Sequence, residues 1–251
     1  KKEMIKLWGV EGTLFSLGIF ITIVAFVGAR LIKNPPAEWT PPGGNDSNSQ
    51  TGPESNEIED VSPREFVQTP RFYLLWLALA SVIGGGLTAI GLLTAYGEIE
   101  LQLAPAFAAL AVSFYSLSNG LGRPVAGWFA DRWGTIKVMI FIYTIQALVF
   151  IAFPWVATSP VLLFGCSLLL GLGYASTFAL FPVLVASVSG TKHLGTNYGL
   201  VFSAFGLGAI SSLIGSWLLD TTGSFAYPFL LAGFATVFGL ILLVILYKKF
   251  M

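Results

Sequence analysis

Charged residues are scarce in this chain, and their scarcity excludes a soluble globular domain. Only 10% of the 251 residues are Asp, Glu, Lys or Arg, whereas 55% are hydrophobic. A soluble domain carries about 25% charged residues, which cover its water-facing surface. The long apolar runs have the length of membrane helices, and a backbone in lipid must satisfy its own hydrogen bonds. The composition therefore predicts an all-α polytopic membrane protein that sits in a lipid bilayer.

Reactive and metal-binding side chains are also few. The chain has one cysteine, Cys166, and one histidine, His193, so neither a disulfide framework nor a metal-ligand cluster is expected. The apolar runs contain no paired acids and no Ser/His pair, and the net charge of zero comes without a basic tract. We therefore expect no enzyme activity, no catalytic residue, no cofactor, no metal site and no nucleic-acid partner.

Seven apolar runs are long enough to cross a bilayer, for which about 20 helical residues are needed. One run lies before a long polar segment and six lie after it, which predicts a first helix in residues 1–32, a linker in 33–71 and a six-helix bundle in 72–251. The predicted spans are approximately Trp8–Ile32, Phe72–Tyr96, Pro105–Phe129, Ile136–Val156, Pro160–Val188, Asn197–Leu219 and Tyr227–Tyr247.

The polar segment has two kinds of composition. Its middle is rich in Gly, Ser, Asn and acids and lacks aromatic residues, which predicts disorder. Near its end, Ser62 and Pro63 are followed by Arg64 and Glu65, which is typical of an N-cap with proline at the first helical position. We therefore expect a short amphipathic helix at the membrane interface just before the second span.

The lysines and arginines predict the orientation of the chain in a cell membrane. With the linker in the cytoplasm, the 13 basic residues divide so that only Lys1, Lys2 and Lys6 lie outside. An excess of lysine and arginine on one side of a membrane protein marks its cytoplasmic side, so the linker and the C-terminus are expected in the cytoplasm. The basic residues predicted on that side are Arg30, Lys33, Arg64, Arg71, Arg123, Arg132, Lys137, Lys192, Lys248 and Lys249.

Arg123 is a charged residue inside a predicted span, and such residues are functional candidates because they are costly in lipid. It lies about two turns before Asp131, or roughly 12 Å along a helix. A guanidinium matches a carboxylate with two parallel hydrogen bonds, which favours an anion-binding role. The alternatives are that Arg123 snorkels to the headgroups or pairs with Asp131.

Tyr174 and Phe178 are spaced four residues apart in a predicted span, which places both rings on one helix face. They are candidates for the wall of a small-anion cavity, in which the Tyr174 hydroxyl would donate a hydrogen bond. Simple packing between helices is the equally weighted alternative. Gly84-Gly85-Gly86 in the second span is interpreted as a packing or gating feature.

Several stretches resemble known carriers. Gly127-Trp128-Phe129-Ala130-Asp131-Arg132-Trp133-Gly134 resembles the loop motif between the eighth and ninth helices of the major facilitator superfamily. Three further stretches resemble the oxalate:formate antiporter family: LIKNPPAEWTPP (31–42), SPREFVQTPRFYLLWL (62–77), and GTNYGLVFSAFGLGA with LLDTTGSF (195–209 and 218–225). The resemblance implies helices 7–12 of that fold preceded by helix 6, seven in total, with an N-terminal helical bundle of the same protein missing. The chain opens on Lys1 rather than methionine, so we expect a fragment.

The resemblance also implies roles for single residues. Arg123 is similar to the arginine that binds carboxylate in oxalate carriers. The Asp131 carboxylate is implied to meet the N-terminus of the eleventh helix near Gly195 and Thr196, so that Gly127, Asp131, Arg132 and Gly134 form an inner gate. The resemblance also implies that oxalate-exchanging members have a lysine at the position on the eleventh helix that Phe205 occupies here.

With one cation instead of two, the site suits a monocarboxylate better than a dicarboxylate. The predicted function is thus alternating-access transport of a small organic anion, by exchange or by symport. Exchange is slightly favoured because the spans hold no other titratable group at depth. A nitrate, sugar or drug carrier of the same superfamily is the main alternative, and a seven-helix receptor or sensor is a remote one.

Overall fold

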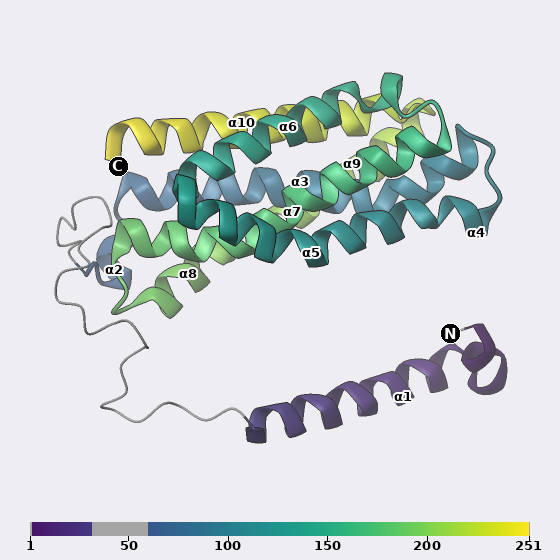
Figure 1. Ribbon diagram of the computed structural model, residues 1–251, viewed down its shortest axis with the longest axis horizontal. Helices are drawn as coiled ribbons and strands as arrows, with labels where there is room; N and C mark the ends of the chain where they lie inside the picture. The colour runs from purple at the N-terminus through teal and green to yellow at the C-terminus, as the bar shows by residue number, and fades with distance from the viewer. Residues whose placement is uncertain (1, 32–59, 251) are drawn as a thin grey trace. The chain divides into compact units, whose positions relative to one another are not determined.

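The computed structural model describes residues 2–31 and 60–250, and every regular element within them is a helix (Figure 1). The chain divides into two compact units, residues 1–55 and 56–251. The first unit contains α1 (Lys2–Leu31), which kinks at Gly9, where φ is 68°. A positive φ of this size favours glycine. The predicted disorder in the middle of the linker lies outside the described residues.

The second unit is a bundle of long helices with three short ones at its ends. The long helices begin at or near the predicted starts of the spans, and proline stands in the first turn of several of them, where its missing N–H costs nothing. The helices are α2 (Pro63–Phe66), α3 (Pro70–Ile99), α4 (Pro105–Ala108), α5 (Leu110–Trp133), α6 (Thr135–Val156), α7 (Pro160–Ser189), α8 (Leu194–Phe202), α9 (Ala204–Thr222) and α10 (Ala226–Phe250).

Six of the seven predicted spans are long and apolar enough to cross a membrane, and they confirm a polytopic membrane protein. The exception is α5, a helix of 24 residues that is not among these six. It carries Arg123, Asp131 and Arg132 together with several serines and glycines. The helix that bears the candidate site is therefore the most polar of the predicted spans.

Two predicted spans are interrupted. The third is split at Ala109 into α4 and α5, and the sixth is split at Ser203 into α8 and α9. Helix interruptions at membrane depth are tolerated where the backbone is buried in protein or lines a cavity. The second interruption lies at the candidate site, as described below.

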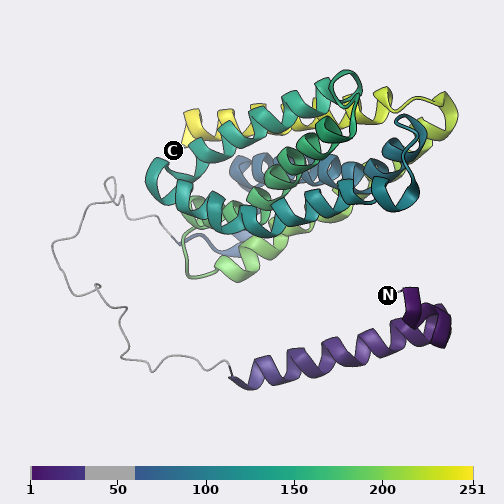
Figure 2. The same ribbon diagram turned by 45° about the vertical axis from the view of Figure 1, so that its right-hand side comes forward.

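The central helix of the bundle is α3, which packs against α10, α9 and α7, while α5 packs mainly on α7. Figures 1 and 2 show α2, α8, the α5–α6 turn and the C-terminal end of α10 at one end of this unit, and α4 at the other. The turns that the basic residues predict on one side of the membrane thus lie at one end of the bundle.

The predicted helix start at Ser62 is confirmed. The Ser62 side chain accepts from the Glu65 backbone N–H, and the Glu65 carboxylate accepts from the Ser62 backbone N–H, which forms a capping box. The Ser62 hydroxyl also donates to the Glu65 carboxylate at 2.7 Å, and this bond, together with that from the Ser62 backbone N–H, holds the pKa of the Glu65 carboxyl below its ordinary value. The helix is only one turn long and ends on Phe66, which is fully buried and packs edge-on against Phe72 at 5.6 Å between ring centroids.

Candidate functional site: an arginine beside a row of aromatic rings

Arg123 lies near the middle of α5, about ten residues or roughly 15 Å before the helix ends at Trp133. Its side chain is exposed on this bundle. The guanidinium carbon sits 5.2 Å from the centroid of the Phe178 ring on α7, within the ~6 Å over which a cation is attracted to a ring face. The charge is therefore held beside an aromatic surface of the neighbouring helix.

The Phe178 ring belongs to a row of rings contributed by three helices. Within this row, Tyr174 and Phe178 of α7 meet edge to face at 5.0 Å between centroids. Phe178 reaches Phe202 at the end of α8 at 6.2 Å, and Phe202 stacks on Phe205 of α9 at 5.6 Å. Arg123, Tyr174, Phe178 and Phe205, which the sequence predicts as one site, thus lie in one continuous set of contacts.

Tyr174 is the most tightly held of these residues, with 6% of its surface exposed. Its ring fills the space left by Gly86 of α3, where any Cβ atom would overlap the ring carbons. Tyr115 of α5 lies beside the same ring at 6.0 Å between centroids and donates a hydrogen bond to the Gly86 carbonyl at 3.2 Å. The glycine run therefore serves packing at Gly86, and Tyr174 ties α3, α5 and α7 together.

The interruption between α8 and α9 contacts α3. The Trp76 indole N–H donates to the Ser203 hydroxyl oxygen at 3.0 Å, and the Ser203 hydroxyl donates to the Leu200 carbonyl at 2.7 Å. Ser203 stands between Phe202 and Phe205, so this hydrogen bond fixes the point where the row passes from one helix to the next. An indole N–H and a serine hydroxyl thereby border the aromatic rings.

The predicted gating motif forms a one-residue turn between α5 and α6. Gly134 has φ 88°, a conformation that L side chains rarely adopt, which explains the glycine. The Arg132 guanidinium lies over the Trp128 ring at 3.9 Å. Asp131 is exposed, and a Cβ atom at Gly127 would meet no atom within 4 Å. Contact of Asp131 with Gly195 or Thr196 is not among the hydrogen bonds of the described residues and stays a prediction.

A different carboxylate occupies the turn between α7 and α8. The Lys192 backbone N–H donates to the Asp60 carboxylate at 3.1 Å, and the Asn197 side chain donates to the Val61 carbonyl at 3.0 Å. Gly190, with φ 75°, leaves room for Asp60. The end of the predicted linker is therefore attached to the start of α8, the helix that carries Phe202.

Sequence reasoning missed three kinds of residue at this site. Phe202 joins the α7 rings to Phe205, and its spacing of four from Tyr198 is the same signal that identified Tyr174 and Phe178. Asn119 lies one turn before Arg123 on the same face of α5, and its buried side-chain oxygen has no hydrogen-bond partner among the described residues. The Trp76–Ser203 contact joins residues 127 positions apart and has no local signal.

Comparisons with known proteins agree with this architecture. The profile of the Major Facilitator Superfamily matches residues 82–249. The oxalate:formate antiporter of Oxalobacter formigenes is 28% identical over 206 residues, which is 80% of this chain and 46% of that protein. Mouse (Mus musculus) monocarboxylate transporter 12 is 32% identical over 145 residues, 54% of this chain and 29% of that protein.

Solved structures show the same fold. A crystal structure of the Escherichia coli fucose:proton symporter superposes with a TM-score of 0.62 at 17% identity, and the match covers 94% of this chain and 55% of that one. The chain spans about half the length of the bacterial oxalate:formate antiporter that it matches. The family profile covers well over half of the chain, and together with the helical bundle it shows that this chain belongs to the major facilitator superfamily of membrane transporters.

Proposed function

We propose that this chain is the C-terminal half of a secondary carrier for small organic anions, and that Arg123 binds the carboxylate. The observation that carries the proposal is the position of the guanidinium of α5 over Phe178, which belongs to a row of rings from α7, α8 and α9. A carboxylate can accept two hydrogen bonds from the guanidinium while the rings exclude water from its other side. The relatives that bear the names of oxalate, formate and monocarboxylates support this substrate class.

The position of Arg123 favours substrate binding over snorkelling. A snorkelling side chain extends along its helix toward the nearer headgroups. The Arg123 guanidinium instead lies against a ring of the neighbouring helix, and its Cα lies roughly 15 Å from the end of α5. An exposed cation at that depth calls for a polar cavity, and in carriers of this kind such a cavity forms between two bundles near the bilayer midplane.

The substrate we propose is a monoanion. Arg123 is the one cation in contact with the row among the residues that the structure describes, and the row ends on Phe205 rather than on a second positive charge. A dicarboxylate would leave one carboxylate without a cation in this half, at considerable cost in a medium of low dielectric. Tyr174 offers a hydroxyl to the same anion, and the spans described here favour exchange over proton symport.

The gate and the topology form part of the proposal. Gly127, Asp131, Arg132 and Gly134 close the inner side in one state and release it in the other, as an N-terminal bundle rocks against this one. Residues 72–251 form the C-terminal bundle, residues 1–32 the preceding helix and residues 33–71 the linker. The protein resides in the cell membrane with the linker and C-terminus in the cytoplasm.

The test is counterflow in proteoliposomes made with the full-length protein. Vesicles are loaded with formate, lactate, pyruvate, oxalate, nitrate or a neutral sugar, and uptake of the labelled solute is followed for the wild type and for Arg123→Gln. We expect counterflow of a monocarboxylate that Arg123→Gln abolishes. Arg64→Gln on α2 removes the same charge outside the site and serves as the matched control, with activity close to wild type.

The alternatives predict different results. Uptake of a neutral solute that is unaffected by Arg123→Gln would refute the anion site. Membership of the superfamily would then be the only part of the assignment that stands. A Phe205→Lys variant addresses the charge argument separately, because a second cation should shift preference toward oxalate. An unchanged ratio of oxalate to formate uptake in that variant would contradict the assignment of Phe205.

A further inference from the structure

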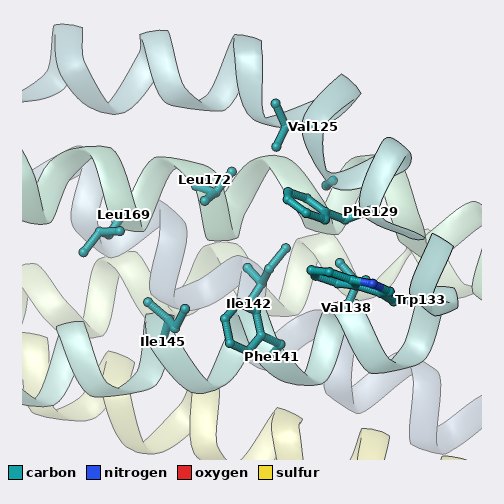
Figure 3. Close-up of a pocket in the computed structure, with 10 residues that line it drawn as sticks. Val125, Phe129, Trp133, Val138, Phe141, Ile142, Ile145, Leu169 and Leu172 are labelled. Carbon is teal, nitrogen blue, oxygen red and sulfur yellow. The ribbon is translucent and has the colours of Figure 1, made fainter. Parts of the chain in front are cut away.

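An apolar groove on the outside of the bundle lies between α5, α6 and α7. It has a volume of about 200 Å³, and Figure 3 shows its side chains converging from the three helices. Several of them are well exposed, such as Trp133 (58%), Phe141 (61%) and Leu169 (43%). The lining residues are all apolar: Val125, Ala126, Phe129, Trp133, Val138, Phe141, Ile142, Ile145, Leu169 and Leu172.

The groove is separate from the candidate anion site. At 3.6 residues per turn, Arg123 lies roughly 90° round α5 from the line through Ala126, Phe129 and Trp133, and Asp131 lies roughly 170° from it. Asp131 therefore directs its negative charge away from the groove. An apolar cavity of about 150 Å³ already accommodates benzene and stays dry, so this groove has room for part of an acyl chain.

A positive charge lies at the end of the groove that is formed by the α5–α6 turn. Lys137 is exposed and stands one helical turn before Phe141, on nearly the same face of α6. Arg132 does not belong to this rim, because its guanidinium lies at 3.9 Å over the ring of Trp128, which does not line the groove. Trp133 itself stacks on Phe129 at 4.8 Å, and tryptophan favours the headgroup level of a membrane. Apolar walls thus end in a cationic rim.

We propose that this groove binds an anionic diacyl phospholipid, with one acyl chain between α5, α6 and α7 and the headgroup phosphate on Lys137. The acyl chain alone contributes little binding free energy, because the surrounding lipid is equally apolar. Selectivity comes from the rim, where Lys137 favours an anionic headgroup by about fivefold, the equivalent of about 1 kcal/mol. Since Lys137 lies in the first turn of α6, directly after the Gly134 turn, a bound lipid would also restrain that turn.

The test measures lipid binding to the purified chain by native mass spectrometry. Dioleoyl phosphatidylglycerol and dioleoyl phosphatidylcholine are titrated separately, and the dissociation constant of the first bound lipid is compared. We expect tighter binding of phosphatidylglycerol, and a loss of about fivefold in its affinity in Lys137→Gln with phosphatidylcholine unchanged. Lys248→Gln at the end of α10 removes the same charge elsewhere and should leave both affinities unchanged.

A second pair of variants tests the groove itself. Leu169→Trp fills the space between the helices, whereas Leu168→Trp adds the same bulk at a neighbouring exposed residue that does not line the groove. We expect only Leu169→Trp to abolish the first phosphatidylglycerol site, and both proteins should unfold at similar temperatures if folding is intact. Equal affinity for the two lipids, equal effects of Lys137→Gln and Lys248→Gln, or an intact site in a folded Leu169→Trp variant would overturn the proposal and indicate ordinary annular lipid.

Discussion

Replacing Gly86 by alanine should destabilise the bundle and disturb the candidate site together. A Cβ atom at this position overlaps the ring of Tyr174, which is 6% exposed and also lies beside the ring of Tyr115. The ring cannot turn away without moving Phe178, which it meets edge to face at 5.0 Å. Overpacking of this kind costs about 1–3 kcal/mol. We expect a loss of that size in the free energy of unfolding, and reduced counterflow in the same variant.

Gly91→Ala is the matched control on the same helix. A Cβ atom there meets only Ser212, at 3.7 Å, which is an ordinary contact. Alanine is favoured over glycine in a helix by up to about 1 kcal/mol, so Gly91→Ala should be neutral or slightly stabilising. Both variants are compared by titration with sodium dodecyl sulfate in mixed micelles, followed by tryptophan fluorescence, and by counterflow in proteoliposomes.

A double-mutant cycle identifies the cause of the loss. Tyr174→Ala removes the ring and so makes room for the new methyl group, and the combination with Gly86→Ala should be more stable than the sum of the two single changes by about 0.5–3 kcal/mol. Additive effects would show that the ring and the glycine are not in contact. Equal stability of Gly86→Ala and Gly91→Ala would refute the packing argument altogether.

Three smaller perturbations test other contacts. Phe178→Leu keeps the apolar character of the side chain but removes the ring face under the guanidinium. It should raise KM for the transported anion about two- to fivefold, the range that corresponds to ~0.5–1 kcal/mol. An unchanged KM would contradict the cation–ring contact. Asp60→Asn should weaken the hydrogen bond that the Lys192 backbone N–H donates to residue 60 by about 1 kcal/mol. The amide hydrogen of Lys192 should then exchange faster with solvent, and exchange as slow as in the wild type would refute this contact. The Glu65 carboxyl has a lowered pKa, so its contribution to the capping box is present above its ordinary value of 4.5 and is lost as pH falls through the lowered value. Ser62→Ala removes the hydroxyl donor but keeps the backbone N–H, so the pKa of Glu65, followed by NMR, should rise toward its ordinary value. An unchanged pKa in this variant would show that the Ser62 hydroxyl is not the cause.

Local features of this chain could be predicted from the sequence because each is determined by residues close together. The long helices follow from apolar length, and the start of α2 follows from the serine, proline and glutamate that form its cap. The pairing of Tyr174 with Phe178 follows from a spacing of four within one helix. These predictions needed no knowledge of how the helices pack.

Features that depend on tertiary contacts could not be predicted in the same way. The interruption at Ser203 accompanies a hydrogen bond from Trp76, 127 residues earlier, and the Asp60 contact with Lys192 spans 132 residues. Phe202 fits the helical spacing rule, yet its role as a bridge emerges only when α8 lies beside α7. Hydropathy alone does not place α5 among the membrane-spanning helices, because this helix carries Arg123, Asp131 and Arg132 together with several serines and glycines.

The exposure of Arg123 leads to a final prediction about the isolated chain. Its side chain lies on the surface of this bundle, and its Cα lies roughly 15 Å from the end of α5, where contact of the charge with lipid would cost several kcal/mol. A second bundle that encloses a water-filled crevice removes that cost and supplies the opposite wall of the site. We therefore expect the chain alone, reconstituted in liposomes, to show no specific uptake of formate, lactate or oxalate, and coexpression with the N-terminal half to restore it. Robust, saturable uptake by the chain alone would overturn the proposed division of the carrier into two halves.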